Sequence, residues 1–181
     1  KAQADKLHHE KSWTMAPDGG HFRRVVPSPL PMKIIEMNVI RKLVDDGIVV
    51  ICAGGGGIPV AYDENRKLFG VDAVIDKDLA SALLARGLDA DMFAMLTDVP
   101  YVYADFGTEK QKAIKAVHPD TLEKLDFASG SMGPKVKGAC WFVRETGNMS
   151  VIGRLSDLSN VISGNTGTLI SNEVEGIQFE E

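Results

Sequence analysis

The sequence predicts an α/β fold built on a mostly parallel sheet. Two apolar runs, at residues 48–53 and 91–96, lack alternation with polar residues, which is typical of strands covered on both faces. Helical segments alternate with the strand candidates along the chain. A glycine-rich loop follows the first run, and open α/β sheets bind ligands at such strand ends. We therefore expect the functional site at the carboxyl ends of the strands.

The composition is that of an ordinary globular protein. The 181 residues include 20 basic and 25 acidic side chains, which gives a net charge of −5, and 44% of the residues are apolar. This length is enough for one domain with a sizeable core. The mild acidity argues against a nucleic-acid partner, which usually needs a clustered basic face. The longest apolar runs have the length of strands, so no membrane span is expected.

The cysteines, histidines and first residues indicate the cellular location and the absence of a protein metal site. Cys52 and Cys140 are too few for a disulfide scaffold and form no metal-ligand pair, so reduced thiols and a cytoplasmic location are expected. His8 and His9 are adjacent, which does not place them on one helix face, and no protein metal site is expected. The chain opens with Lys and a charged segment instead of a signal peptide, so we expect a trimmed N-terminus or part of a longer chain.

The N-terminal third is expected to be irregular before a first amphipathic helix. Residues 1–11 predict a short polar helix, and the prolines in residues 12–31 predict an extended linker. The next helix is expected to begin at Pro31 and to end at Gly47. Ile35, Val39 and Leu43 are spaced four residues apart, which places them on one helix face.

The remaining elements follow from apolar runs, caps and glycines. They are expected, in chain order, as a strand at 48–53, a hairpin at 60–70, a strand at 71–75, a helix capped by Asp76 and closed by Gly87, a strand at 91–96, helices at 118–126 and 130–145, and strands at 149–153 and 167–170 with a short helix between them. The acidic tail, residues 171–181, is expected to fray. The predicted domain boundaries therefore separate residues 1–30, 31–170 and 171–181.

Four consecutive glycines form the first candidate site. Gly54, Gly55, Gly56 and Gly57 follow the predicted strand at residues 48–53. Glycines let backbone N–H groups approach a ligand closely and form anion-binding nests. The spacing matches neither a dinucleotide fingerprint nor a P-loop. The alternative is a tight turn without a ligand, although four glycines carry a large entropic cost for a turn alone.

Two lysines near helix starts form the second and third candidates. Lys77 and Asp78 would lie in the first turn of the helix that Asp76 caps, where a lysine opposes the helix dipole unless an anion joins it. Lys135 follows the glycine turn at residues 130–133, and a helix N-terminus with one lysine can bind phosphate. Together the lysines suit phosphoryl transfer, which needs fixed positive charge. A solvated, capped helix start is the alternative for Lys77.

An apolar and aromatic loop forms the fourth candidate. The loop at residues 97–103 follows the predicted strand at residues 91–96 and contains Thr97, Asp98 and Tyr103. Such a loop could seat an adenine ring. The alternative, core aromatics beside a turn, fits the residues equally well.

Five motifs resemble the carbamate kinase family, part of the amino acid kinase superfold. They occur in the family's order and spacing across nearly all of residues 12–170. The motifs are RRVVPSPLP (23–31), CAGGGGIPV (52–60), VDAVIDKDLAS (71–81), LTDVPYVY (96–103) and GSMGPKV (130–136).

The resemblance implies a fold and an activity. Its fold is a three-layer αβα sandwich, in which residues 31–170 would form the nucleotide-binding lobe and residues 1–30 the remnant of a protruding subdomain and linker. The reaction is ATP plus carbamate to ADP plus carbamoyl phosphate, with Mg²⁺, usually running toward ATP in arginine breakdown. The resemblance also implies a homodimer.

Residue roles follow by motif match. The resemblance implies that Lys77 contacts the nucleotide phosphates, that Lys135 reaches the transferring phosphoryl group and that Asp78 orients both lysines. The four-glycine loop would line the phosphoryl channel. Nucleotide contacts are further implied for Thr97, Asp98, Tyr103, Met132 and Gly133.

The resemblance also implies what this sequence lacks. Family members open with a strand and a Gly-Gly-Asn-Ala loop that binds carbamate, and nothing similar precedes the PSP segment here. The sequence therefore resembles a C-terminal portion, with the N-terminal lobe missing. Two alternatives stay open: a nucleotide-binding lobe without turnover of its own, because an unaligned acceptor loses the proximity effect, and an amino acid kinase with a different acceptor.

Overall fold

The computed structural model describes residues 1–128 and 130–181. The chain divides into two compact units, one of Lys1–Leu30 with Ile58–Ile75 and the other of Pro31–Gly57 with Asp76–Glu181. Among the described residues, no helix combines the length and the apolar character that crossing a membrane requires.

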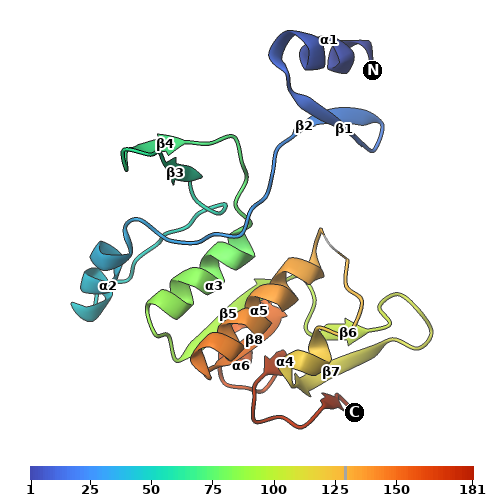
Figure 1. The fold of residues 1–181 in the computed structure, drawn as a ribbon. Helices are drawn as coiled ribbons and strands as arrows, with labels where there is room; N and C mark the ends of the chain where they lie inside the picture. Colours follow the sequence, from blue (N-terminus) through green and yellow to red (C-terminus); the bar gives the residue numbers. More distant parts are fainter. Residues whose placement is uncertain (129) are drawn as a thin grey trace. The chain divides into compact units, whose positions relative to one another are not determined.

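The first unit consists of one helix and two short hairpins (Figure 1). Its elements are α1 (Ala2–Lys11), β1 (Thr14–Asp18), β2 (His21–Val25), β3 (Val60–Tyr62) and β4 (Leu68–Gly70). The predicted helix at residues 1–11 and the hairpin at 60–70 are confirmed. The Asp63 carboxylate closes the second hairpin by accepting hydrogen bonds from the backbone N–H groups of Asn65 and Lys67, at 2.9 and 2.8 Å.

The second unit holds the sheet and its helices. Its elements are α2 (Met37–Asp45), α3 (Lys77–Gly87), β5 (Met92–Thr97), β6 (Val102–Ala104), β7 (Lys112–Val117), α4 (Pro119–Leu122), α5 (Met132–Thr146), β8 (Met149–Arg154), a 3₁₀ turn (Leu155–Asp157), α6 (Leu158–Ile162), β9 (Thr168–Ile170) and β10 (Ile177–Phe179). The strands predicted at 91–96, 149–153 and 167–170 and the helix at 130–145 are confirmed.

The sheet of the second unit has the order β10-β7-β9-β8-β5, and β6 also pairs with β7. The parallel pairing that we expected is found between β5 and β8, in register from Met92 with Met149 to Thr97 with Arg154, and between β7 and β9. The pairings of β8 with β9, β10 with β7, and β6 with β7 are antiparallel. The buried hydroxyl of Thr168 joins three strands, because it accepts from the Val102 N–H and donates to the Ile114 carbonyl.

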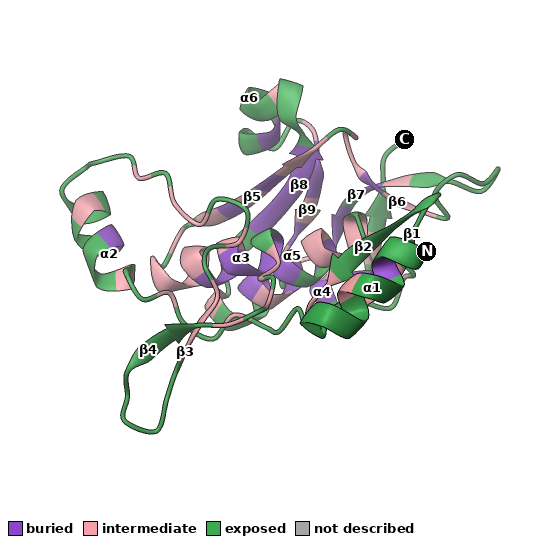
Figure 2. Ribbon diagram, turned by 90° about the horizontal axis from the view of Figure 1, so that it is seen from above, coloured by how far each residue is buried: buried purple, intermediate pink, exposed green. Residues whose placement is uncertain are grey.

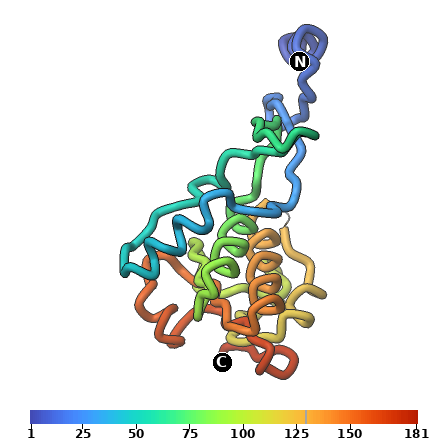
Figure 3. Tube along the Cα trace, turned by 60° about the vertical axis from the view of Figure 1, so that its left-hand side comes forward, coloured from blue at the N-terminus to red at the C-terminus, as the bar shows by residue number. Residues whose placement is uncertain are grey.

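Helices cover both faces of this sheet and give the three predicted layers. Helices α3 and α5 lie side by side on one face (Figures 1 and 3), and α6 lies on the other (Figure 2). Gly138 lets α3 and α5 approach closely, because a Cβ at this position would lie 3.1 Å from the Asp78 carbonyl oxygen. Gly153 likewise lets β8 and α6 approach closely, because a Cβ at this position would lie 2.5 Å from the Val161 side chain. The α/β class is therefore confirmed.

The core lies between the sheet and the α3–α5 layer (Figure 2). Ile114, Ile152 and Phe142 are fully buried there, and the ring of Phe142 packs against that of Phe93 with centroids 5.5 Å apart. Burying such side chains contributes about 1.5–3 kcal/mol each to folding. The same packing fixes the N-terminal turns of α3 and α5 relative to each other.

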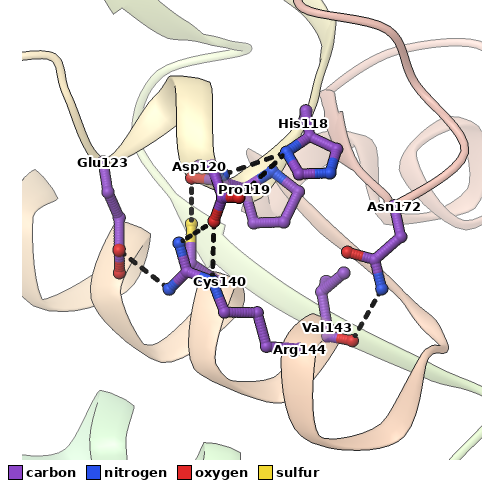
Figure 4. Close-up of polar contacts among 8 residues, drawn as sticks. All are labelled: His118, Pro119, Asp120, Glu123, Cys140, Val143, Arg144 and Asn172. Atoms are coloured by element: carbon purple, nitrogen blue, oxygen red, sulfur yellow. Dashed lines mark hydrogen bonds and ion pairs between the residues drawn. The ribbon is translucent and has the colours of Figure 1, made fainter.

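A polar clamp holds α4 against α5 (Figure 4). Arg144 donates to one Asp120 carboxylate oxygen from Nε and Nη2, at 3.0 and 2.7 Å, and its Nη1 lies 2.8 Å from Glu123. The hydrogen bond from Arg144 lowers the pKa of Asp120 below its ordinary value of 3.8. Deeper in the same contact, Cys140 Sγ lies 3.6 Å from the Pro119 carbonyl oxygen, and burial raises the pKa of this thiol to about 12. Cys140 is therefore a neutral core residue.

Replacing Asp120 with asparagine is expected to change how stability depends on pH. The pKa of Asp120 is lowered in the folded state, so its contribution is complete above the unfolded value of 3.8 and is lost as the pH falls through the folded value. The free energy of unfolding of Asp120→Asn, measured by urea titration, should therefore fall less steeply than that of the wild type below about pH 5. Arg144→Gln should flatten the profile similarly, and an unchanged slope in both variants would contradict the clamp.

Two expectations near the N-terminus are wrong. Residues 12–31 are not simply extended, because β1 and β2 pair as a hairpin within them. The second helix begins at Met37 and not at Pro31. Its end is as predicted, because Gly47 has a φ of 78° and the N–H groups of Gly47 and Ile48 donate to the carbonyls of Val44 and Leu43.

The predicted buried strand at residues 48–53 is also wrong. The segment forms no strand, and Val49 and Ile51 are 91% and 98% exposed. A strand buried on both faces needs neighbouring strands at its edges, and no strand among the described residues pairs with this segment. Residues 71–75 likewise form no strand.

Three further local expectations are corrected. The tail at residues 171–181 is not wholly frayed, because β10 pairs with β7. Gly87 is the last residue of α3 and not the left-handed residue beyond it; a Cβ there would meet the end of the Met37 side chain. The helix predicted at residues 118–126 is shorter, with α4 ending at Leu122.

Candidate functional site

A cavity of about 410 Å³ lies within the second unit. Its walls come from the N-terminal turns of α3 and α5, the loop after β5, strand β6 with the loop that follows it, and the segment before α5. Two lysines, several aspartates and apolar side chains line the same cavity. A ligand that fills it would combine an anionic part with a flat apolar part.

Asp78 organises the charged part of the cavity. Its side chain is 11% exposed, and Lys135 Nζ lies 3.2 and 3.1 Å from its two carboxylate oxygens. The Lys135 side chain is itself only 14% exposed, so the pair is fixed and largely shielded from solvent. Lys77 Nζ lies 3.9 Å from the same carboxylate but its side chain is 60% exposed. Asp78 therefore holds one ammonium group in place and leaves the other free to move toward an anion.

The start of helix α5 adds positive potential to the two lysines, whereas the start of α3 is already occupied by the carboxylate of Asp76. Asp76 caps α3 as predicted, since its Oδ1 accepts from the N–H groups of Asp78 and Leu79 at 2.8 and 3.1 Å. Helix α5 starts at Met132 without a side-chain cap from Ser131. The backbone N–H groups at a helix N-terminus attract anions. The site therefore suits a phosphate group.

The apolar part of the cavity is mainly aromatic. Tyr103 lies on β6, and its ring centroid is 5.9 Å from that of Phe106, in the loop that follows. Phe127 and Met132, which also pack against the core, line the cavity on the side of α5, and Val99 comes from the loop after β5. These side chains can make apolar contacts with a flat organic ring, which water cannot make.

Most of the predicted site residues come together here. The cavity is lined by Lys77, Asp78, Thr97, Asp98, Tyr103, Met132 and Lys135. Gly133 is not among the lining residues; an added Cβ would lie 3.0 Å from the Ala128 carbonyl oxygen, so Gly133 shapes the first turn of α5.

The four-glycine loop is not part of this cavity. Gly54, Gly56 and Gly57 have φ values of 48°, 130° and 91°, which only glycine adopts readily. An added Cβ at Gly54, Gly55 or Gly57 would meet no atom within 4 Å. The backbone thus explains the glycines locally, and the role of the loop in a phosphoryl channel stays a prediction.

The sequence reasoning missed four lining residues. Phe106 follows β6 in a polar loop, and Asp126, Phe127 and Ala128 precede the glycine turn at residues 130–133. The signal that could have identified Phe106 is an aromatic residue beside glycine within a polar stretch, a few residues after the Tyr101–Tyr103 loop.

The sequence of this chain is similar to those of known kinases. A model of the amino acid kinase family matches residues 4–153. The chain is 52% identical over 179 residues to a carbamate kinase of Haemophilus influenzae, covering 99% of this chain and 58% of that protein. A carbamate kinase of Rhizobium meliloti is 47% identical, with 98% and 56% covered. The chain thus spans a little over half the length of these curated relatives.

Solved structures are similar over the same extent. The structure of carbamate kinase from Giardia lamblia bound to AMP-PNP has a TM-score of 0.88 and 40% sequence identity, and the match covers 94% of this chain and 56% of that one. A UMP kinase from Bacillus anthracis has a TM-score of 0.58 at 14% identity, which shows likeness of fold alone.

Proposed function

The chain belongs to the amino acid kinase family, and from that premise we propose that it acts as a carbamate kinase and carries the nucleotide-binding site of that enzyme. The observation that carries this proposal is the buried Lys135–Asp78 pair beside the exposed Lys77, in a cavity that also presents aromatic rings. The identity to carbamate kinases over nearly all of this chain supports the choice of reaction.

The proposed reaction moves one phosphoryl group between ADP and carbamate. In the ATP-forming direction a terminal phosphate oxygen of ADP attacks phosphorus of carbamoyl phosphate, the new P–O bond forms, and the bond from phosphorus to the carbamate oxygen breaks. The carbamate leaves with that electron pair. Such transfers need alignment and charge stabilisation more than covalent chemistry by the protein.

The residues of this chain divide that task. Lys135, held by Asp78, would place a fixed positive charge at the transferring phosphoryl group. Lys77, whose side chain is 60% exposed, would contact the phosphates of the nucleotide. Because Asp78 contacts both ammonium groups, it acts as a positioning residue that keeps Lys135 from turning into solvent.

Magnesium is part of this proposal. When bound, it would neutralise phosphate charge during transfer. The described residues contain no group of three His, Cys, Asp or Glu side chains that could hold a metal. An ion carried by the phosphates keeps several waters and takes one or two protein carboxylates. Asp98 and Asp126 are the lining carboxylates that neither cap α3 nor bind Lys135, and they would supply such ligands. The homodimer and the cytoplasmic location implied by the resemblance stay predictions.

The alternative is a nucleotide-binding lobe without turnover of its own. It is favoured by one observation: the matched relatives are longer, since this chain covers 58% and 56% of their lengths. An acceptor site outside the 181 residues would leave the bound nucleotide without an aligned partner.

One experiment separates these functions. ADP is titrated into the 181-residue chain with Mg²⁺ in a calorimeter, and carbamoyl phosphate is then added with a coupled assay for ATP. ADP binding with ATP formation supports a complete kinase. ADP binding without ATP supports the lobe alone. Absence of ADP binding would contradict both.

A further inference from the structure

We propose that Phe106 is the base-stacking residue of this site, and that it determines how strongly the site prefers a nucleotide to a bare polyphosphate. The inference rests on the proposed nucleotide function and adds a residue that the sequence motifs do not contain.

Phe106 is both exposed and part of the cavity wall. It is 68% exposed, although it is a large apolar residue, and it lines the cavity. Its ring lies against Tyr103, with centroids 5.9 Å apart and the planes at 50°. Tyr103 therefore supports Phe106 from β6 while a large part of the Phe106 ring stays uncovered. A flat ligand ring in the cavity would cover apolar surface that is otherwise in water.

The loop that carries Phe106 is held by its own polar groups. The Thr108 hydroxyl donates to the Asp105 carbonyl at 2.8 Å, and the Gln111 side chain accepts from the Gly107 N–H at 2.8 Å. Asp105 and Gly107, the neighbours of Phe106, have φ values of 51° and 78° and turn the backbone on both sides of it. A residue fixed in this way loses little conformational freedom when a ligand binds.

The chemistry of the cavity assigns the base to this wall. Lys77, Lys135 and the start of α5 attract phosphates, but they do not distinguish a nucleotide from inorganic phosphate chains. Only the aromatic wall meets a part of the ligand that polyphosphates lack. Stacking between a base and an aromatic ring changes affinity by about 5- to 100-fold for each base and tolerates different bases.

Binding of two ligands to three variants tests the inference. ADP and inorganic tripolyphosphate, each with Mg²⁺, are titrated calorimetrically into the 181-residue wild type and into Phe106→Ala, Phe106→Trp and Phe69→Ala. Phe69 is the matched control, because it is 48% exposed on β4 and does not line this cavity. Thermal unfolding of each variant reports whether the fold is retained.

Phe106→Ala should weaken ADP binding about tenfold and change tripolyphosphate binding less than twofold. Phe106→Trp should retain the ADP affinity of the wild type, and Phe69→Ala should bind both ligands as the wild type does. If ADP binds the wild type but Phe106→Ala binds it equally well, the stacking role is overturned and the nucleotide function stands. Equal weakening of both ligands would also overturn it. A wild type that does not bind ADP would overturn both proposals.

Discussion

Replacing Lys135 with alanine is expected to weaken ADP binding by about 10- to 100-fold, because a hydrogen bond between charged groups contributes about 1.5–3 kcal/mol. Lys135 is the better ordered of the two cavity lysines, since Asp78 holds it from both carboxylate oxygens. Calorimetric titration of ADP measures the effect. Lys137→Ala is the matched control, because Lys137 lies on the same helix but is exposed and outside the cavity.

Stability must be measured on the same variant. Lys135→Ala leaves the buried carboxylate of Asp78 with Lys77 as its nearest cation, and an uncompensated buried charge is costly. The double variant Asp78→Ala with Lys135→Ala removes that charge and should regain stability without regaining ADP affinity. A folded Lys135→Ala variant that binds ADP like the wild type would contradict the assignment of Lys135.

The second large effect is expected from Gly138→Val. A Cβ at this position would lie 3.1 Å from the Asp78 carbonyl oxygen, so the branched side chain must push α3 away from α5. Overpacking of this kind costs about 1–3 kcal/mol. Valine has a better helix propensity than glycine, so a loss of stability cannot come from the helix itself. Urea titration should show the loss, and ADP binding should weaken because both lysines depend on this contact.

Gly70→Val provides the comparison for that substitution. Gly70 has no atom within 4 Å of an added Cβ and lies on β4, so valine should be tolerated there. If Gly138→Val were as stable as the wild type and bound ADP normally, the close approach of α3 and α5 would not be what positions the site.

The site residues that follow local sequence rules could be predicted. A cap, a first turn and a lysine are set by neighbours within a few residues, so Asp76, Lys77 and Asp78 could be placed correctly on α3. The contact between Asp78 and Lys135 joins positions far apart in the chain. Only the resemblance to a family, and not the pattern of residues, predicted that pairing.

Predictions that depend on distant partners were less successful. The run at residues 48–53 has the composition of a buried strand, but pairing depends on which strands are present beside it. Strands β6 and β10 were missed because each has only three residues, too few to show a periodic pattern, and β7 was missed because two lysines interrupt its apolar residues. Phe106 was missed because an exposed aromatic residue in a polar loop is recognised only when the cavity beside it is known.

The uncovered segment at residues 48–53 has a consequence for the behaviour of this chain in solution. Six residues that carry no charge and no proline, most of them β-branched, have the composition of a cross-β nucleus. Because the side chains of Val49 and Ile51 are almost wholly accessible, copies of the segment can stack on one another as concentration rises. Asp45 and Asp46 precede it and four glycines follow, and both oppose the growth of such a stack. Whichever surface covers this segment therefore also protects the protein from self-association.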